Sequence, residues 1–398
     1  MNLASVFSAV AHKVLVAVDL PGGSHQHEIN GDKGLKEFFG ISEPTRGTLS
    51  WHYFADDREP AQEEGDFNFY DARAKSSDRT GRSEWRLYYD GSFLENAEVG
   101  DRFFLARSQS GQLFGLVFQG GSAWLRAAQA LFGVQISTSS FDTVPSETLA
   151  SQELELLRRQ ILDELSLDLA LPVRPTDEQL MLEKYGRTFP TTKEMALFAR
   201  SQVEVDPDRP DETLVRWLNR EEELFRALES VVILERLATG FRTVDEFIQY
   251  SLSIQNRRKS RMGFALQNHL SEVFVLQGLR FTAQARTEEN NRPDFIFPGQ
   301  DEYHDEAFDA SLLVMLGVKS TSKDRWRQVL TEADRIPQKH LCTLEAGISV
   351  KQTAEMQRQK LTLVIPDSLH ETYTSAQQER LLNVGAFIEF ARLKQNQA

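Results

Sequence analysis

A stretch near the C-terminal end, residues 293–332, carries the pattern that most constrains what this chain can fold into. Asp294 opens it, the apolar run 312–318 ends on Lys319, and Glu332 follows further along. Carboxylates are hard oxygen ligands that suit Mg²⁺, and a bound metal next to a lysine is suited to phosphodiester cleavage. The pattern therefore predicts a metal-dependent site in which Asp294 and Glu332 bind Mg²⁺ and Lys319 lies beside the attacked phosphate.

The spacing also predicts how these residues meet. Asp294 opens an apolar stretch and Lys319 closes another, so adjacent strand ends of one sheet would bring them together. Glu332 is expected on the following helix, which begins near Asp324 and folds back over the pair. Nucleases with this arrangement often have a carboxylate two residues before the lysine, but Gly317 occupies that position here. A structural role, with a turn aspartate and a strand-end lysine, remains open on these residues alone.

Composition limits the class of protein. The chain has 398 residues, enough for two domains of roughly 150 residues each. No apolar run approaches the ~20 residues of a membrane helix, so no membrane association is expected. Residues 1–18 lack a basic segment and a clear cleavage site, which argues against a signal peptide. Cys342 is the single cysteine, which excludes a disulfide framework and a cysteine-based zinc site and favours a cytoplasmic location.

The net charge of −14 argues against non-specific nucleic-acid binding, which depends on neutralising phosphates. Basic residues nevertheless gather at 73–86, 257–261 and 319–327. The first of these strips contains Trp85, a basic and aromatic character that suits DNA, although a charged hairpin loop in solvent explains it equally well. An acidic protein with local basic strips of this kind can still bind DNA through those strips.

Lys323, Asp324 and Arg325 form a second group with recognition chemistry. Lysine and arginine donate to guanine O6 and N7, and aspartate accepts from cytosine N4, so three such residues in a row could read a G·C pair. The alternative is a solvated first helical turn, in which Asp324 is favoured by the helix dipole.

The chain divides into three parts by its local patterns. Residues 1–135 contain short β-runs broken by turn signals, residues 136–190 are a linker with a connecting helix, and residues 191–398 alternate helices and strands. Strands are predicted at 13–18, 49–54, 84–89, 101–108, 112–119, 294–297, 312–318, 341–344 and 361–366. Helices are predicted at 123–133, 150–169, 191–202, 211–239, 243–254 and 264–279.

Several long motifs resemble one family. The segments SIQNRRKSRMG, PDFIFPGQDEYHD, LGVKSTSKDRWRQVLTEADRIPQKHLCTLEAGIS and LVIPDSLHETY strongly resemble the catalytic domain of EcoRII-type restriction endonucleases. The resemblance runs from about residue 210 to 390. More faintly, GGSHQ near residue 22, FYDAR near residue 69 and the arginine-rich turn with Trp85 resemble the effector DNA-binding domain of the same family.

The resemblance implies an α/β C-terminal restriction-endonuclease-like fold, PD-(D/E)XK, preceded by a mainly-β, B3-like pseudobarrel. It implies a homodimeric, Mg²⁺-dependent type II restriction endonuclease that cuts double-stranded DNA at a CC(A/T)GG-like site. A cognate cytosine methyltransferase would be its genetic partner. In the family, the positions of Asp294, Lys319 and Glu332 form the catalytic centre, and Tyr303 matches a tyrosine of the active-site region.

The resemblance also indicates where DNA is bound. Lys323, Asp324 and Arg325 fall where related enzymes contact the G·C bases. The further DNA-binding candidates are Arg220, Arg257, Arg258, His25, Gln26, Arg73, Lys75, Arg79, Arg82, Trp85 and Arg86.

Two departures from the family pattern leave alternatives open. A helix glutamate of the family falls near Gln267 here, and Glu272 is the nearby carboxylate that could replace it. The N-terminal part diverges enough that its DNA target does not transfer; if both parts bind DNA, full activity would need two sites. A non-cleaving DNA-binding regulator of the same fold is one alternative, and a nuclease for nicked or structured DNA is another.

Overall fold

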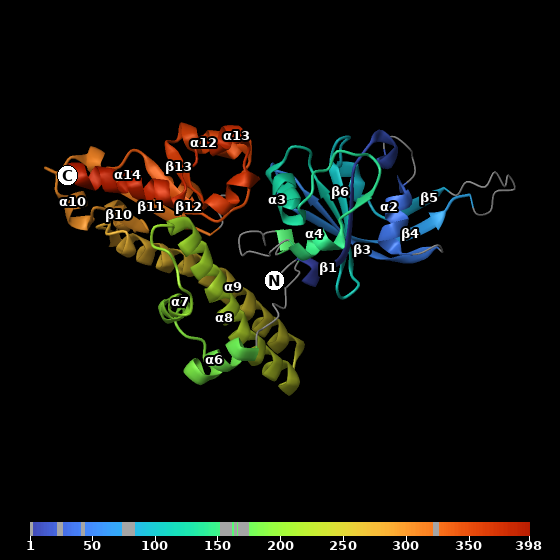
Figure 1. The fold of residues 1–398 in the computed structure, drawn as a ribbon, viewed down its shortest axis with the longest axis horizontal. Coiled ribbons are helices and arrows are strands. Elements are labelled where there is room, and N and C mark those ends of the chain that lie inside the picture. The colour runs from blue at the N-terminus through green and yellow to red at the C-terminus, as the bar shows by residue number, and fades with distance from the viewer. Residues whose placement is uncertain are drawn as a thin grey trace. The chain divides into compact units, whose positions relative to one another are not determined.

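The computed structural model describes residues 3–21, 27–40, 44–73, 84–151, 161–162, 165, 175–320 and 326–398. The chain divides into two compact units, Met1–Leu169 and Ala170–Ala398 (Figure 1). Each unit is built around a sheet of its own.

The first unit is mainly β. Its strands are β1 (Phe7–Val14), β2 (Glu28–Asn30), β3 (Thr45–Phe54), β4 (Ala61–Asp71), β5 (Trp85–Tyr89), β6 (Arg102–Ser108), β7 (Leu113–Phe118) and β8 (Asp142–Thr143). The described residues form one eight-stranded sheet in the order β2-β5-β4-β3-β7-β6-β1-β8. β3 and β7 run parallel, and the other pairs are antiparallel.

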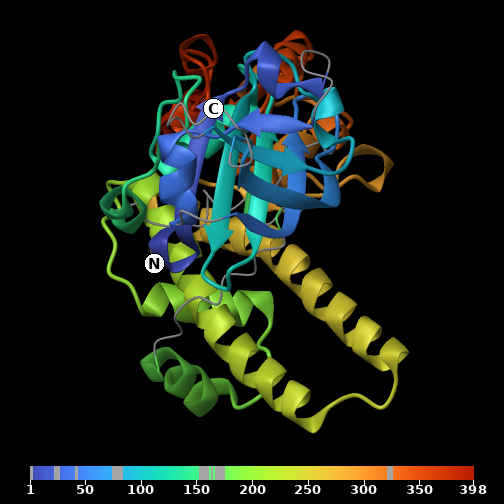
Figure 2. The ribbon, with the colours of Figure 1, turned by 90° about the vertical axis from the view of Figure 1, so that its right-hand side faces the viewer.

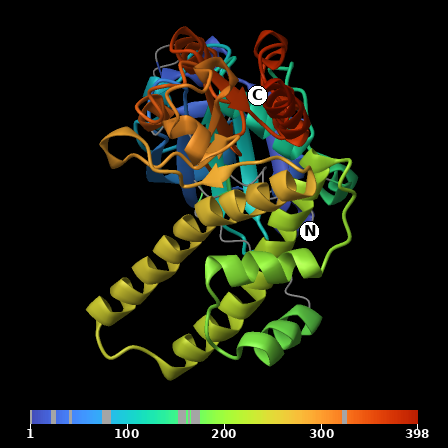
Figure 3. The same cartoon turned by 90° about the vertical axis from the view of Figure 1, so that its left-hand side faces the viewer.

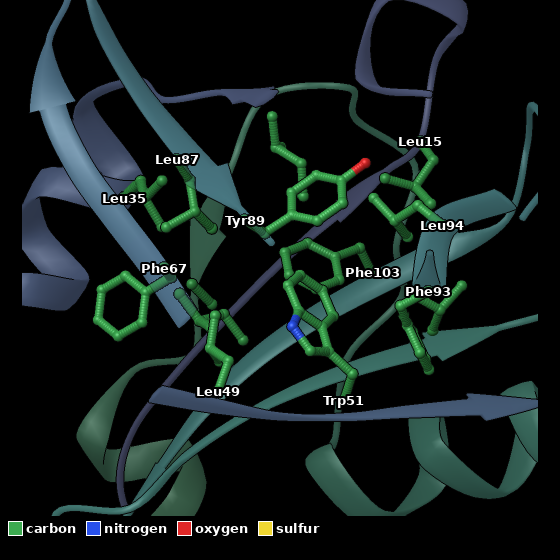
Figure 4. Close-up of a cluster of buried hydrophobic side chains, with 14 of the residues drawn as sticks. Leu15, Leu35, Leu49, Trp51, Phe67, Leu87, Tyr89, Phe93, Leu94 and Phe103 are labelled. Atoms are coloured by element: carbon green, nitrogen blue, oxygen red, sulfur yellow. The ribbon is translucent and has the colours of Figure 1, made fainter. Parts of the chain in front are cut away.

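Alternating side chains on these strands form an aromatic core. In β5, Trp85, Leu87 and Tyr89 point inward while the residues between them face outward. Trp51 lies at the centre, with its ring 5.3 Å from that of Tyr89 and 5.7 Å from that of Phe103 (Figure 4). Burial of these large rings is the main source of stability for a sheet of this kind.

Short helices cover this sheet: α2 (Lys33–Phe39), α3 (Ala123–Phe132) and α4 (Ser146–Ser151), with 3₁₀ turns at Leu3–Ser5, Ala17–Asp19 and Phe93–Asn96. Asp32 caps α2 by accepting the N–H groups of Gly34 and Leu35. Ser122 caps α3, which ends at Gly133 in the left-handed conformation, as predicted.

The second unit combines helices with a mixed sheet. Its helices are α6 (Pro175–Tyr185), α7 (Thr192–Ser201), α8 (Pro210–Thr239), α9 (Val244–Leu276), α10 (Gln300–His304), α11 (Trp326–Leu330), α12 (Val350–Arg358), α13 (Ser375–Gln378) and α14 (Val384–Gln397). Its strands are β9 (Thr282–Ala283), β10 (Phe295–Phe297), β11 (Val314–Lys319), β12 (Lys339–Thr343) and β13 (Leu361–Val364), and 3₁₀ turns lie at Glu288–Asn290, Ala310–Leu312 and Asp367–Thr372.

The described strands of this unit form a sheet in the order β13-β12-β11-β10-β9. β11, β12 and β13 are parallel, whereas β10 is antiparallel to both β11 and β9. Phe274 of α9 packs against Phe295 and Phe297 of β10, with ring centroids 5.2 and 5.3 Å away, and Phe387 of α14 completes the cluster. These contacts fix the strand that follows Asp294.

The helices α8 and α9 are two long rods joined by a short turn (Figures 2 and 3). The sequence patterns predicted two helices, 243–254 and 264–279, but α9 is continuous. The polar stretch between them stays helical because its arginines pair with buried glutamates of α8. Arg258 lies 2.7 Å from Glu229, and Arg261 lies 3.1 Å from Glu221.

The predicted fold class, an α/β C-terminal domain preceded by a mainly-β domain, is confirmed, while the B3-like character of the first unit stays a prediction. The structure differs from the predicted 136–190 linker because β8 lies within it and pairs with β1 of the first unit. Strand β1 also begins and ends earlier than the predicted 13–18. Within the described residues, no helix is long and apolar enough to cross a membrane.

Candidate active site

Antiparallel pairing of β10 with β11 brings Asp294 to Lys319. Phe295 pairs with Leu316, so the residue before β10 reaches the last residues of β11. The backbone N–H of Val318 donates to Asp294 Oδ2 over 2.7 Å, and Lys319 Nζ lies 3.8 Å from the same oxygen. The predicted meeting of Asp294 and Lys319 is therefore present, with each side chain anchored at a strand end.

The environment of Asp294 is largely shielded from solvent. The Gln284 side-chain amide donates to Asp294 Oδ1 over 2.8 Å. Burial raises the pKa of the Asp294 carboxyl, while the charge of Lys319 and the hydrogen bonds from Val318 and Gln284 act in the opposite direction. A carboxylate held in this way is fixed in position and has reduced access to water.

Glu332 lies in the turn after α11, and not on a helix as predicted. The helix ends at Leu330, and the following turn includes Ala333 with a φ of 53°. Burial raises the pKa of Glu332 to about 7; the nearby charge of Lys319 opposes this effect, and that of Asp294 adds to it. Asp294 and Lys319 therefore lie close enough to Glu332 for their charges to influence its pKa.

Packing of α11 explains the glycine in β11. A Cβ atom on Gly317 would lie 2.9 Å from both methyl carbons of Val329, which is buried on α11. A carboxylate two residues before Lys319 therefore has no room while α11 packs there. Glu332, just beyond the same helix, stays the predicted second carboxylate of the site.

The donor set fits a divalent metal. Glu332 Oε2 is buried and has no hydrogen-bond partner among the described residues, so it is an oxygen available to a cation. Mg²⁺ is usually held by one or two carboxylates, with waters and substrate phosphates completing its shell. Asp294 and Glu332 match that requirement. The described residues contain no group of three or more His, Cys, Asp or Glu suited to an all-protein metal cage.

Tyr303 lies next to this site but contacts different groups. It is buried on α10, and its hydroxyl donates to Glu288 over 2.6–2.7 Å. Among the described residues, no hydrogen bond or ion pair joins Tyr303 to Asp294 or Lys319. Its hydroxyl instead accepts from the backbone N–H of Arg335. Glu288, to which the hydroxyl donates, accepts from the backbone N–H of Asp334. The catalytic role of Tyr303 stays a prediction.

Trp85 requires a correction among the predicted DNA contacts. Its side chain is buried in the first unit's core, with its ring 4.8 Å from that of Phe69 and Lys36 above it. An indole in this position stabilises the sheet and has no face open to a nucleic acid.

The other described candidates are mostly held in ion pairs. Arg220 binds Asp177 through two hydrogen bonds of 2.7 and 2.9 Å, and Arg258 pairs with Glu229. Two more lie in the first unit: Arg86 contacts Glu28 and Glu84, and Arg73 lies 2.6 Å from Glu84. Arg257 of α9 lies over the ring of Phe189 at 4.1 Å. Their DNA contacts stay predictions.

Some of the predicted residues and elements lie outside the described residues. These are the DNA-binding candidates His25, Gln26, Lys75, Arg79, Arg82, Lys323, Asp324 and Arg325, and most of the predicted helix 150–169. Glu272, the possible replacement for the family's helix glutamate, is described and lies 3.3 Å from Arg200 in an ion pair.

The sequence patterns missed three residues of the site: Gln284, Glu288 and Lys339. Lys339 is nearly fully buried and opens β12. A lysine at the start of an apolar strand was a usable signal, because burying an ammonium group requires partners for it. Gln284, with a φ of 52°, left no such signal.

A mixed sheet covered by helices, with an aspartate and a lysine in contact at neighbouring strand ends, fits the PD-(D/E)XK-like fold. Residues 225–388 match the family model described as EcoRII C terminal.

One curated relative and two solved structures are similar to this chain. The type II restriction enzyme EcoRII of Escherichia coli is 43% identical over 231 residues, which cover 58% of this chain and 56% of that enzyme. This chain thus matches little more than half of the relative's length. Metal-depleted Ecl18kI bound to uncleaved, modified DNA is 15% identical with a TM-score of 0.46, covering 56% of this chain and 84% of its own. The restriction endonuclease PspGI–substrate DNA complex is 16% identical with a TM-score of 0.45, covering 53% and 95%.

Proposed function

We propose that this protein is a type II restriction endonuclease that uses Mg²⁺ to hydrolyse phosphodiester bonds in double-stranded DNA. The observation that carries the proposal is the contact of Asp294 with Lys319 at neighbouring strand ends, with the buried Glu332 oxygen under the electrostatic influence of both. All three lie inside the residues that match the EcoRII C-terminal family. The 43% identity to a type II restriction enzyme supports the same activity.

Each residue has a distinct part in the reaction. Asp294 and Glu332 would hold the metal, which supplies positive charge to the attacked phosphate. Lys319 orients the attacking water and offsets negative charge that develops on the phosphate. Because Asp294 and Glu332 are both largely buried, these charges act in a medium where electrostatic interactions are stronger than in water.

Recognition of a CC(A/T)GG-like site belongs to the same proposal. Lys323, Asp324 and Arg325 follow shortly after Lys319 in the sequence, and their chemistry suits the outer G·C pairs. Cleavage of both strands requires two active sites, so the protein is proposed to act as a homodimer. A cytosine methyltransferase would protect the host's own sites.

The first unit is proposed to bind a second copy of the DNA. On its solvent-facing side, a hollow of about 520 Å³ is lined by parts of β3, β4 and β5, including Arg46 and Tyr88. Tyr88 is 41% exposed. An exposed aromatic ring next to an arginine is a surface on which DNA can be held.

Digestion of plasmid and phage DNA with Mg²⁺, followed by sequencing of the ends, tests the activity. Discrete fragments that share one end sequence are expected from the wild-type protein, and none with EDTA or with Lys319→Ala. Lys351→Ala, at an exposed position of α12, is the matched control and should cleave normally. Tight DNA binding without cleavage would instead favour a non-cleaving regulator, and Gln267 would then be the first residue to restore to glutamate.

The role of the first unit is tested with substrates that carry one or two sites. Faster cleavage of two-site DNA, and activation of one-site DNA by an added oligonucleotide with the site, are expected. Equal rates on both substrates, with no response to the oligonucleotide, would contradict second-site binding and leave the cleavage activity itself unaffected.

A further inference from the structure

The turn that carries Glu332 is held by contacts from several separate elements. Thr331 O accepts from the Asn291 side-chain amide over 2.9 Å. Lys339 Nζ donates to the carbonyl oxygens of Glu332 and, over 2.6 Å, of Ala333. On the other side, the Asp334 N–H donates to Glu288 over 3.3 Å. Successive backbone groups of residues 331–334 are thus fixed by side chains from outside the turn.

The turn needs these outside contacts because the backbone preferences of its own residues do not favour its conformation. Ala333 has a φ of 53°, a left-handed conformation that alanine adopts at a cost, and no regular helix or strand includes residues 331–338. A turn of this kind persists where its surroundings determine it. Lys339 is the contact with the greatest constraint, because its ammonium group is buried and binds two adjacent carbonyls.

Tyr303 belongs to the same arrangement. Its hydroxyl donates to Glu288, which accepts from Asp334, and it also accepts from the Arg335 N–H over 3.4 Å. The Arg335 guanidinium in turn donates to backbone carbonyls near α10, including that of Phe308 over 3.1 Å. Tyr303 therefore contacts the turn at Arg335 and, through Glu288, at Asp334, whereas Lys339 contacts the turn at Glu332 and Ala333.

From these contacts we propose that Lys339 is a positioning residue of the active site. Its ammonium group holds the turn 331–335 so that the Glu332 carboxylate faces Asp294 and Lys319, ready to bind a divalent cation. Lys339 itself touches neither DNA nor metal in this proposal, which rests on the proposed nuclease function. Outer contacts that orient metal ligands commonly change metal affinity by about 10- to 100-fold when they are removed.

The experiment compares Lys339→Met with Lys339→Arg and with a matched control, Lys13→Met. Lys13 is another buried lysine, paired with Asp19 at 2.9 Å in the first unit, so its loss should destabilise the protein without affecting this turn. Two quantities are measured for each folded variant: Mg²⁺ binding by calorimetry, and hydrogen exchange of the amides of residues 331–335. Cleavage is followed as a function of Mg²⁺ concentration.

Lys339→Met is expected to weaken Mg²⁺ binding by about 10- to 100-fold, to speed exchange in 331–335, and to leave cleavage largely recoverable at high Mg²⁺. Lys339→Arg should recover part of both effects, and Lys13→Met should lower the melting temperature while Mg²⁺ binding stays at the wild-type value. If Lys339→Met does not fold, Asn291→Ala removes the more exposed contact to Thr331 and should give the same changes at smaller size.

The outcomes separate the two proposals. Wild-type Mg²⁺ binding and wild-type exchange in Lys339→Met, or in Asn291→Ala if the first variant is unfolded, would overturn the positioning role. A wild-type protein that neither cleaves DNA nor binds Mg²⁺ would overturn the nuclease proposal. In that case the positioning role is overturned as well, because it depends on the nuclease function. This holds even if slow hydrogen exchange shows that residues 331–335 are held rigidly.

Discussion

The carboxylate of Asp294 accepts a hydrogen bond over 2.7 Å from the backbone N–H of Val318, the residue immediately before Lys319. This bond ties the start of β10 to the end of β11, so the register of the two strands also fixes the distance between the aspartate and the lysine. A shift of one residue in that register would turn Lys319 to the other face of the sheet. The fold and the active site are thus coupled through one backbone contact.

Asp294→Asn is expected to separate chemistry from folding. An asparagine oxygen can still accept from Val318, but it lacks the charge that a metal requires. Cleavage should fall by at least ~100-fold, since even outer contacts of metal ligands are worth 10- to 100-fold. The melting temperature should stay equal or rise, because burial raises the pKa of Asp294 and its charged form is costly. Cleavage rates and thermal melts check both parts.

Asp301→Asn is the control for this substitution, because Asp301 is an exposed carboxylate on nearby α10. It should leave cleavage unchanged. Full cleavage by Asp294→Asn would remove Asp294 from the site.

The pH dependence follows from Glu332. Its pKa is raised from 4.5 to about 7 by burial, so the carboxyl is mostly protonated at pH 6 and mostly ionised at pH 8. Mg²⁺ binds the ionised form. At low Mg²⁺, cleavage should therefore rise about 10-fold between pH 6 and pH 8, and higher Mg²⁺ should move the midpoint to lower pH. Rates at two Mg²⁺ concentrations test this, and a midpoint that ignores Mg²⁺ would contradict it.

The same shift predicts a change in stability for the metal-free protein. A carboxyl whose folded pKa lies above its unfolded value stabilises the fold fully below about pH 4.5, and this contribution is lost as the pH rises through about 7. At pH 8 without metal, Glu332→Gln is expected to melt at a higher temperature than the wild-type protein. An equal or lower melting temperature would show that the carboxylate is stabilised by groups other than those described.

The sequence predicted the parts of the site that depend on strand ends. Asp294 and Lys319 flank apolar runs, and pairing of such runs in one sheet left few other arrangements. Glu332 was predicted on the wrong element, because the chain leaves α11 after Leu330 and passes through a left-handed residue, Ala333. Its part in the site stays a prediction. Alanine gives no local signal for that conformation, which long-range contacts impose.

Two other features depended on partners that lie far away in the sequence. The polar centre of α9 looked like a break between helices, but its arginines are buried against glutamates of α8. Residues 142–143 looked like linker, but they pair with β1, more than a hundred residues earlier. Periodicity within a segment does not contain this information, since the compensating groups belong to other segments.

Trp85 should behave as a core residue. Trp85→Ala is expected to destabilise the protein by about 3–5 kcal/mol, the usual cost of removing a large buried ring, while Trp85→Phe should cost less and keep DNA binding. Denaturant unfolding measures the stability of both variants, and a DNA-binding assay measures their affinity for DNA. Arg73→Ala, whose side chain is 52% exposed, is the stability control and should change stability by less than about 0.5 kcal/mol. Loss of DNA binding in a stable Trp85→Phe would restore the DNA-contact hypothesis.

Gly317 and Val329 provide a test of why this active site lacks a carboxylate on β11. Gly317→Ala places a methyl group 2.9 Å from both methyl carbons of Val329, and overpacking of this kind typically costs about 1–3 kcal/mol. The displaced α11 should also disturb Glu332 and lower cleavage. Val329→Ala makes room, so the double variant should lose less stability than the two single losses added together.

Denaturant unfolding of the wild-type protein, the two single variants and the double variant measures this coupling between Gly317 and Val329. Gly263→Ala is the control for glycine replacement, because an added Cβ there meets nothing within 4 Å. Simple additivity would show that α11 does not exclude a side chain at position 317, and Gly317→Glu would then be expected to fold and to supply a carboxylate beside Lys319.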